Sequence, residues 1–379
     1  MAMKTFKARL YPNRKQQDQI ESNFGACRFV WNELLAMQSR RHENGGRYLN
    51  EFAMNYLLKP LKQQYPWLKE ADATSLLVVS HNLHLAFQRL FKKQGGYPKF
   101  KAKRYARQVY HSNVVNGNVR LVDQHRLRLP KLGSVRFRAG RLPSGKFKTA
   151  TVTRDFVGHY YVLVTAEVTL DPLPKTDRAV GLDVGVTDLV ITSDGVKYPT
   201  KRFDKLLARK KHYWEKRLAR RRLAAEREIA WDKHNKANYV RHLPDFKNYM
   251  RAKQMVAKYN ARIANQRRDY LQQISVALIR EYDVIKLEGL KTKNLLHNHH
   301  LSRVIANHSW HALRTMLEYK AEWYGKTVST VSPFKTSQFC SLCGYDDGKH
   351  DLDVRKWTCP QCQTHHDRDI NAARNILAA

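Results

Sequence analysis

The sequence predicts an α+β protein made of several domains. At 379 residues, the chain is long enough to form two or three domains, each with its own core. Apolar residues recur at helical spacing between about residues 14 and 91, whereas short alternating stretches separated by glycines fill residues 109–170. After residue 176, strand-like and helix-like segments alternate, and four cysteines lie among them. We therefore expect a helical part, a β part and a mixed part.

The first hundred residues are predicted to be mainly helical. Residues 4–12 are the exception, because apolar and basic residues alternate there up to a proline, which predicts a half-buried strand that pairs with strands far downstream. Cys27 has no second cysteine near it and is interpreted as a small packed residue. Two apolar helix faces predict core positions: Phe24, Cys27, Trp31, Leu34 and Leu35 on one, and Leu76, Val79, Leu83, Ala86, Phe87 and Leu90 on the other.

Two further N-terminal segments have patterns of their own. Residues 94–105 mix glycines, cations and aromatic rings, which suits a segment that lies along a phosphate backbone, although an ordinary solvated basic loop would have the same composition. Residues 109–170 alternate over short stretches with glycines at the turns, which predicts a small antiparallel barrel. Residues 171–175 contain two prolines and are predicted to be a linker.

The charge of the chain indicates a polyanionic partner. The formal net charge is +36, from 69 Lys and Arg against 33 Asp and Glu, while a hydrophobic content of 42% argues against disorder. No run approaches 18 apolar residues and the first twelve residues lack the apolar segment of a signal peptide, so a membrane partner is not expected. We expect a nucleic-acid partner, binding that weakens with salt, and a location in the reducing cytoplasm, associated with the nucleoid.

Asp183 stands in an unusual position. Residues 179–192 form two apolar runs around a bend, which predicts a buried strand turning into a second one, with Asp183 inside the first run. A charge there costs several kcal/mol unless it is paired or bound to a cation. Gly181 and Gly185 leave room for another group to approach the backbone. A metal ligand and an aspartate that starts a turn both fit this stretch.

Two other carboxylates occupy comparable positions. Residues 282–290 form a short β-favouring run that places Glu288 at the tip of a strand. Residues 367–377 predict the opening of a helix, in which Asp369 shares the apolar face and Asp367 is the N-terminal cap. Three acids that lead into or out of buried elements are what a site for two Mg²⁺ ions, about 3.5–4 Å apart, requires.

Residues 201–270 hold 22 Lys and Arg against 7 Asp and Glu. They predict two helices divided near residues 242–244, whose cations form either a phosphate-contacting wall or a solvated face. His297, His299 and His300 follow in a polar stretch, but no anchoring strand or partner spacing supports a zinc site there. A helix from Trp310 to about residue 325 and a strand over residues 327–332 are expected before the cysteines.

The four clustered cysteines predict a metal site. Cys340, Cys343, Cys359 and Cys362 have the spacing of a two-knuckle, four-thiolate zinc site that holds one ion. Two disulfides, free thiols or bound iron are the alternatives, and the adjacent His365 and His366 could compete as ligands. Because four sulfurs leave no open coordination position, the zinc is expected to be structural.

Several motifs together resemble the transposon-encoded TnpB family, which is related to the compact type V CRISPR effector nucleases. The motifs are Arg9–Pro12, Trp31-Asn32, Gly181–Gly185, Leu287–Leu290, Leu317–Ala321, Cys340–Gly344 and Asp367–Ala373, and they span nearly the whole chain. The resemblance implies an RNase H-like, RuvC-type nuclease domain in which Asp183, Glu288 and Asp369 are the catalytic residues and hold two Mg²⁺ ions. It also implies a guide RNA, a double-stranded DNA target with a short adjacent motif, and a prokaryotic source.

The resemblance also suggests how the chain divides. Residues 1–13 and 104–172 would form the barrel, or wedge, and residues 14–103 a helical recognition insertion. Residues 176–334 and 364–379 would form the nuclease domain, with the zinc-binding insertion at residues 335–363. The expected activity is guide-directed DNA cleavage by a monomer with one RNA. An RNA-guided repressor that does not cut and an unguided DNA transposase are the alternatives.

Overall fold

The computed structural model describes residues 2–103, 107–140, 145–289, 309–351 and 354–379. The protein is an α+β chain of two compact units, Met1–Thr169 and Leu170–Ala379, called here the N-terminal and the C-terminal unit. No helix in the described ranges combines the length and the apolar character needed to cross a membrane. The finer domain boundaries stay a prediction, and so does the histidine stretch at residues 297–300, which lies outside the described residues.

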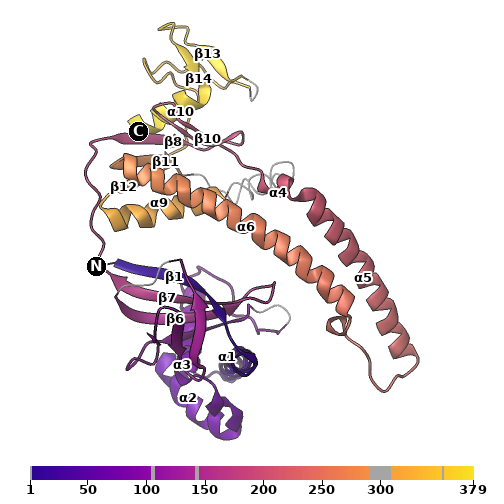
Figure 1. Ribbon diagram of the computed structural model, residues 1–379. Helices are drawn as coiled ribbons and strands as arrows, with labels where there is room; N and C mark the ends of the chain where they lie inside the picture. Colours follow the sequence, from indigo (N-terminus) through magenta and orange to yellow (C-terminus); the bar gives the residue numbers. More distant parts are fainter. Residues whose placement is uncertain (1, 104–106, 141–144, 290–308, 352–353) are drawn as a thin grey trace. The chain divides into compact units, whose positions relative to one another are not determined.

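The N-terminal unit contains a seven-stranded antiparallel sheet in the order β2-β6-β7-β1-β5-β4-β3 (Figure 1). β1 pairs with β7 along almost its whole length and with β5 near its end, which confirms the predicted pairing with distant strands. The strands are β1 (Ala2–Tyr11), β2 (Val109–Asn113), β3 (Arg120–Leu121), β4 (Arg126–Leu129), β5 (Gly133–Arg138), β6 (Lys146–Arg154) and β7 (Tyr160–Val168).

This sheet curls but does not close by hydrogen bonds in the described part of the unit. Phe6, Leu121, Phe137, Phe147 and Val164 come from five different strands and line one small apolar cavity, so the sheet bends over its own interior. Its edge strands β2 and β3 pair with β6 and β4, and not with each other. The predicted barrel is therefore correct in its strands and curvature and wrong in its closure.

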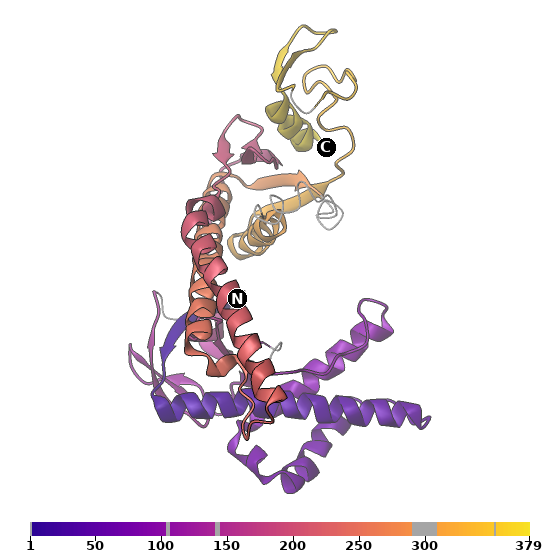
Figure 2. The ribbon, with the colours of Figure 1, turned by 90° about the vertical axis from the view of Figure 1, so that its right-hand side faces the viewer.

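The mainly helical character predicted for residues 14–91 is confirmed. The helices are α1 (Arg14–Glu43), α2 (Glu51–Gln64), the 3-10 turn η1 (Pro66–Glu70) and α3 (Ala73–Phe91). Figure 2 shows α1 as one long uninterrupted helix. Asn13 and Gln16 close a capping box at its start, and Asp72 caps α3. Both predicted apolar faces belong to the core, in which Cys27 is a buried, packed side chain.

The C-terminal unit is built on a five-stranded mixed sheet in the order β10-β9-β8-β11-β12. β8, β9 and β10 form an antiparallel meander, whereas β11 and β12 are parallel to β8. The strands are β8 (Ala179–Asp183), β9 (Asp188–Thr192), β10 (Lys197–Pro199), β11 (Val284–Glu288) and β12 (Thr327–Val331). The strands predicted around Asp183, Glu288 and residues 327–332 are confirmed.

The two faces of this sheet carry different helices (Figure 1). Val180 and Leu182 of β8 pack with Ile285 and Leu287 of β11 against α6 (Lys247–Glu281) and α9 (Trp310–Tyr324). Because side chains alternate along a strand, Gly181 points to the opposite face, which α10 (Arg368–Ala378) covers. The sheet therefore lies between a pair of helices and a single short one.

The remaining elements extend from this core. After α4 (Phe203–Leu206), α5 (Ala208–His234) and the first part of α6 form a two-helix arm that reaches away from the sheet (Figure 1). The turn η2 (Leu243–Asp245) divides the two helices, as the sequence predicted. A short ribbon of β13 (Lys356–Thr358) and β14 (His365–Asp367) leads directly into α10.

Candidate active site and metal centre

The first two predicted carboxylates lie side by side at one edge of the C-terminal sheet. Asp183 is the last residue of β8 and Glu288 the last residue of β11, each one position beyond the paired residues Leu182 and Leu287. Neighbouring parallel strands are about 4.8 Å apart, so the two carboxylates leave adjacent backbones at the same level. Both residues alternate with apolar core positions, and they therefore face the side of the sheet that α10 covers.

α10 brings the third carboxylate to this face. Asp369 is the second residue of the helix and is half-buried, while the buried residues Ala372, Ala373 and Ile376 hold the helix on the sheet. Asp367 caps the helix by accepting hydrogen bonds from two backbone amides, which confirms its predicted role as a cap. The structure thus assigns different positions to the two neighbouring aspartates.

The close fit of α10 against β8 depends on Gly181. A Cβ atom added there would lie 2.0 Å from the carbonyl oxygen of Ala373 and 2.6 Å from the amide nitrogen of Leu377. The sequence left open which group approaches the backbone at Gly181, and a metal ion was one possibility. The structure shows that this group is the helix α10. Gly181 has φ below zero, so the requirement for glycine comes from space alone.

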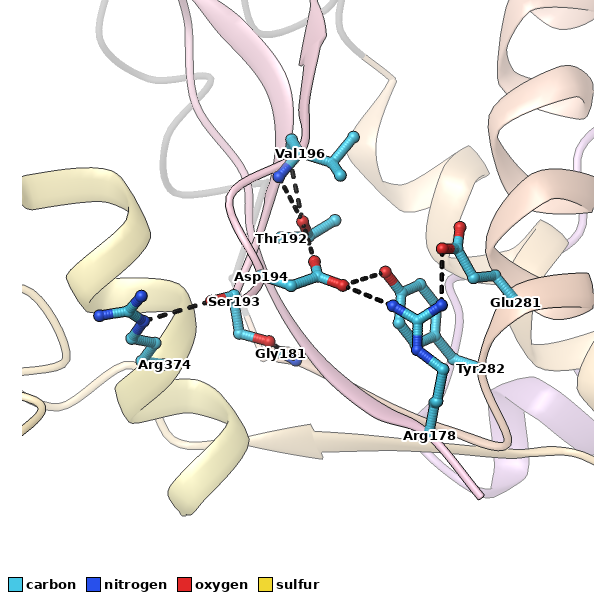
Figure 3. Close-up of polar contacts among 9 residues, drawn as sticks. All are labelled: Arg178, Gly181, Thr192, Ser193, Asp194, Val196, Glu281, Tyr282 and Arg374. Atoms are coloured by element: carbon cyan, nitrogen blue, oxygen red, sulfur yellow. Dashed lines mark hydrogen bonds and ion pairs between the residues drawn. The ribbon is translucent and has the colours of Figure 1, made fainter. Parts of the chain in front are cut away.

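A polar network at the other end of β8 fixes the strand and the helix relative to each other (Figure 3). Ser193 in the β9–β10 turn exchanges hydrogen bonds with Gly181, and its carbonyl oxygen accepts one from Nε of Arg374 in α10, at 3.3 Å. Next to it, the Asp194 carboxylate accepts hydrogen bonds from the side chains of Arg178 and Tyr282. The network ties α10 and the starts of β8 and β11 to one turn.

The electrostatics of the carboxylate group favour a bound cation. Burial, together with the negative charges of Glu288 and Asp369, raises the pKa of Asp183 to about 7. Burial also raises the pKa of Glu288, although a hydrogen bond from Thr336 opposes this shift. In the described part of the chain neither Asp183 nor Glu288 forms an ion pair, and Asp369 pairs only loosely with Arg355 at 3.6 Å. Half-buried and uncompensated carboxylates of this kind are what a hard cation stabilises.

The three carboxylates are not as tightly grouped as the four cysteines. Among the described residues, the cysteine cluster is the only group of three or more potential ligands compact enough to hold one metal ion. The three carboxylates do not form a group of that compactness.

The cysteine cluster is brought together as predicted. The sulfur atoms of Cys340, Cys343, Cys359 and Cys362 all lie within 4.8 Å of one another, and all four thiols are free of disulfides. This set suits a tetrahedral site with four sulfur ligands, for which zinc is the usual ion. Hydrogen bonds from Thr364 lower the pKa of Cys362, which favours the thiolate form that binds metal.

The two neighbouring histidines are not members of this cluster. His366 is buried at 4% exposure, packs against the ring of Trp357 with the two planes tilted by 35°, and holds Nε2 3.1 Å from the sulfur of Cys340. His366 is therefore placed to hydrogen-bond Cys340, one of the four candidate metal ligands. His365 is exposed and bonds to Thr358 at 2.7 Å. Neither histidine replaces a cysteine in the compact group.

Three family models match parts of the chain, and two relatives are similar to it over nearly its whole length. The models match residues 159–299 ("Probable transposase"), 310–376 ("Cas12f1-like, TNB domain") and 1–47 ("Helix-turn-helix domain"). A protein of Streptomyces pristinaespiralis, provisionally named an RNA-guided DNA endonuclease, is 34% identical over 382 residues, covering 99% of this chain and 89% of the relative. The chain belongs to the TnpB family, also written OrfB_IS605.

A second long relative agrees with membership of the TnpB family. The InsQ protein of Escherichia coli K12, provisionally named in the same way, is 30% identical over 398 residues, covering 100% of this chain and 92% of the relative. The solved structure of the mini-RNA-guided endonuclease CRISPR-Cas phi3 aligns over 100% of this chain and 92% of its own, with 10% identity and a TM-score of 0.47. A score this low does not establish a shared fold.

The helix-turn-helix model is only partly reflected in the N-terminal unit of this TnpB-family chain. Residues 1–47 carry the strand β1 and the single helix α1, without a turn between two helices. Trp31 and Asn32 of α1 instead fasten residues 99–101, because Trp31 donates to Lys99 O at 3.0 Å and Asn32 exchanges two hydrogen bonds with the Lys101 backbone. The predicted phosphate-binding segment is thus held along a helix, and its ligand stays a prediction.

The arm of the C-terminal unit contains most of residues 201–270, the stretch rich in Lys and Arg. Of α5, only Ala225 and Asp232 are buried, so its cations lie at the surface. Two of them, Lys211 and Arg222, form ion pairs with glutamates one turn further along the helix. At the tip, Arg241 forms ion pairs with Asp232 at 2.7 Å and with Glu228 at 2.6 Å, which folds the connection between the helices back onto α5. The arm is a preformed basic structure, and its phosphate contacts stay a prediction.

Sequence reasoning missed three polar residues around the candidate active site. Thr336 donates a hydrogen bond to Glu288, while Asn371 and Asn375 of α10 bind the backbone that surrounds Cys340. The spacing of four residues between the asparagines puts them on one helix face and could have signalled a paired role. Nothing in the sequence around Thr336 distinguishes it from an ordinary loop threonine.

Proposed function

We propose that this protein is a guide-RNA-directed, metal-dependent DNA endonuclease with an RNase H-like, RuvC-type nuclease domain. The observation that carries the proposal is the convergence of Asp183, Glu288 and Asp369 on one face of the C-terminal sheet, without an ion pair to Asp183 or Glu288 in the described ranges. The strand order β10-β9-β8-β11-β12, with a three-stranded meander followed by two parallel strands, supports the RNase H-like assignment. The two long relatives are both provisionally named RNA-guided DNA endonucleases.

The three carboxylates are the residues that would hold two Mg²⁺ ions. When bound, such ions supply positive charge to the attacking and the leaving oxygen of a phosphodiester. Asp183 must lose its proton to act as a ligand, and because its pKa is about 7 without metal, binding near neutral pH releases a proton. Asp183 and Glu288 extend from fixed strand ends and Asp369 from a capped helix, so the ligands are held before the substrate arrives.

The rest of the chain fits binding of a guide and its target. A net charge of +36 and the exposed cations of the arm would neutralise the phosphates of an RNA–DNA duplex, while base pairing with the guide would select the sequence. We propose one guide RNA and one double-stranded DNA target per monomer. The cysteine site would hold one Zn²⁺ ion with a structural role, next to the helix that carries Asp369.

Two other functions fit less well. A guided repressor that does not cut would have no need for three intact carboxylates at one site. An unguided DNA transposase could use the same triad, but the long relatives carry names of guided enzymes.

The first experiment is to purify the protein from cells that carry its flanking DNA and to sequence the nucleic acid that comes with it. One dominant RNA with fixed ends is the expected result, and it supplies the guide for a Mg²⁺-dependent cleavage assay. A heterogeneous mixture, or DNA alone, would contradict the proposal and favour the unguided transposase.

Asp183→Asn is the matching variant for that assay. It should abolish cleavage and leave guide and target binding intact, whereas Asp171→Asn makes the same chemical change at an exposed residue of the linker. Full cleavage by Asp183→Asn would refute the carboxylate assignment.

A further inference from the structure

One short segment connects the two metal sites of the C-terminal unit. Residues 336–341 follow the last strand of the sheet, which ends at Val331, and they contain both Thr336 and Cys340. The hydroxyl of Thr336 donates a hydrogen bond to Oε1 of Glu288, and Thr336 itself is only 8% exposed. This is the only hydrogen bond to the Glu288 side chain from the described residues.

The same segment is fastened to α10 by two asparagines. Asn375 donates from Nδ2 to the carbonyl oxygens of Thr336, at 2.8 Å, and Phe339, at 2.7 Å. Asn371, which is 1% exposed, also donates to Phe339 O at 2.7 Å and accepts a hydrogen bond from the backbone amide of Ser341 at 2.8 Å. These hydrogen bonds of Asn371 and Asn375, called here the clamp, hold the backbone on both sides of Cys340.

The clamp places three functions on one rigid connection. α10 carries Asp369 in its first turn and the two asparagines on its next turns. The clamped segment carries the group that bonds Glu288 and also the first cysteine of the metal cluster. A shift of the segment would therefore move the partner of Glu288 relative to Asp369.

We propose that Thr336 is a positioning residue that orients the Glu288 carboxylate for cation binding, and that Asn375 in turn positions Thr336. The inference rests on the proposed function, because it assumes that Glu288 is a cation ligand. With Oε1 held by Thr336, Oε2 has no protein partner among the described residues and is left for the cation. A carboxylate with a fixed orientation loses less rotational freedom when it binds an ion.

The expected loss of cation affinity can be taken from other proteins in which a residue hydrogen-bonds a metal ligand. Removing a group that hydrogen-bonds a metal ligand lowers metal affinity or activity by about 10–100-fold. Thr336→Val keeps the shape of the side chain and removes only the donor, so it should weaken cation binding by that factor. Thr336→Ser keeps the donor and should restore binding to near the wild-type value.

The test uses the full chain and Mn²⁺ as the probe, with free Mn²⁺ counted by electron paramagnetic resonance. Thr330→Val is the matched control, because Thr330 is exposed and lies on the adjacent strand β12. Asn375→Asp removes the donor that holds Thr336 while preserving the size of the side chain. Zinc content and thermal melting of each variant verify that the cysteine site remains folded.

The predicted result is weaker Mn²⁺ binding in Thr336→Val and Asn375→Asp, and unchanged binding in Thr336→Ser and Thr330→Val. Equal binding by Thr336→Val and wild type would overturn the proposal. Asp183→Asn separates the two claims: if it abolishes Mn²⁺ binding while Thr336→Val does not affect it, only the positioning role fails. If neither Asp183→Asn nor Thr336→Val changes Mn²⁺ binding, the carboxylate site itself fails.

Discussion

Replacing Gly181 by alanine perturbs the candidate active site without touching a carboxylate. The new Cβ would lie 2.0 Å from Ala373 O, whereas contacts below 3.0 Å essentially never occur for real Cβ atoms. The two nearest atoms, the carbonyl oxygen of Ala373 and the amide nitrogen of Leu377, are both backbone atoms of α10. The helix must therefore retreat by about 1 Å, the difference between 2.0 and 3.0 Å. Overpacking of this kind costs about 1–3 kcal/mol of stability.

The consequence for activity is larger than the loss of stability. α10 carries Asp369, so the retreat displaces this carboxylate from Asp183 and Glu288. A misplacement of about 1 Å at a reacting centre can cost about 100-fold in rate. We expect Gly181→Ala to cleave about 100-fold more slowly under guide-directed conditions, at a temperature where the variant is still folded.

The assay pairs cleavage kinetics with thermal melting and includes Gly25→Ala as a control. Gly25 lies within α1, where an added Cβ meets no atom within 4 Å, so the same substitution there should leave melting unchanged or raise Tm. A Gly181→Ala variant that cleaves at the wild-type rate and melts at the wild-type temperature would refute the contact between α10 and β8.

Three further predictions concern other parts of the C-terminal unit. Cys359→Ser, or removal of zinc by a chelator, should lower stability by several kcal/mol, and an unchanged melting curve of the demetallated protein would contradict a structural zinc site. The pKa of Asp183 is raised above its unfolded value near 4, so the metal-free protein should lose stability as pH rises from about 4 through 7. Without metal, the free energy of urea unfolding at pH 8 should therefore be about 2–4 kcal/mol higher for Asp183→Asn than for wild type. A lower free energy of unfolding for the variant at pH 8 would contradict this prediction. Arg241→Ala leaves the buried carboxylate of Asp232 without its partner, so amide exchange of residues 235–246 should accelerate while exchange in the sheet stays the same. Equal protection of residues 235–246 in the variant and in wild type would show that Arg241 does not hold the connection between the helices.

Much of the candidate site could be predicted because local patterns carry it. The alternation of apolar residues around Asp183 and Glu288 fixes which face of a strand each carboxylate occupies. The helical period puts Asp369 on the packed side of α10. The cysteine spacing is equally local, because each pair lies on one turn and needs only one ion to join the two.

The rest depends on contacts between distant segments, which no local pattern encodes. From the sequence, Gly181 indicates only that some group can approach the backbone closely. The packing of α10 on β8 is needed to identify Ala373 and Leu377 as its neighbours. Thr336 becomes significant only because the chain folds back over Glu288. Whether the N-terminal sheet closes depends on the geometry of its edge strands, and alternation within a strand does not report that geometry.

In the proposed function, a guide directs cleavage by the three carboxylates. The most direct test is cleavage of one plasmid that contains two target sites, by the wild-type protein loaded with either of two guides in Mg²⁺, beside Asp183→Asn loaded in the same way. We expect the cut to move with the guide and to disappear in Asp183→Asn, which still binds both guides and targets. A cut that stays in place when the guide is exchanged would refute guide-directed cleavage, and a cut that persists in Asp183→Asn would refute the role of the carboxylates.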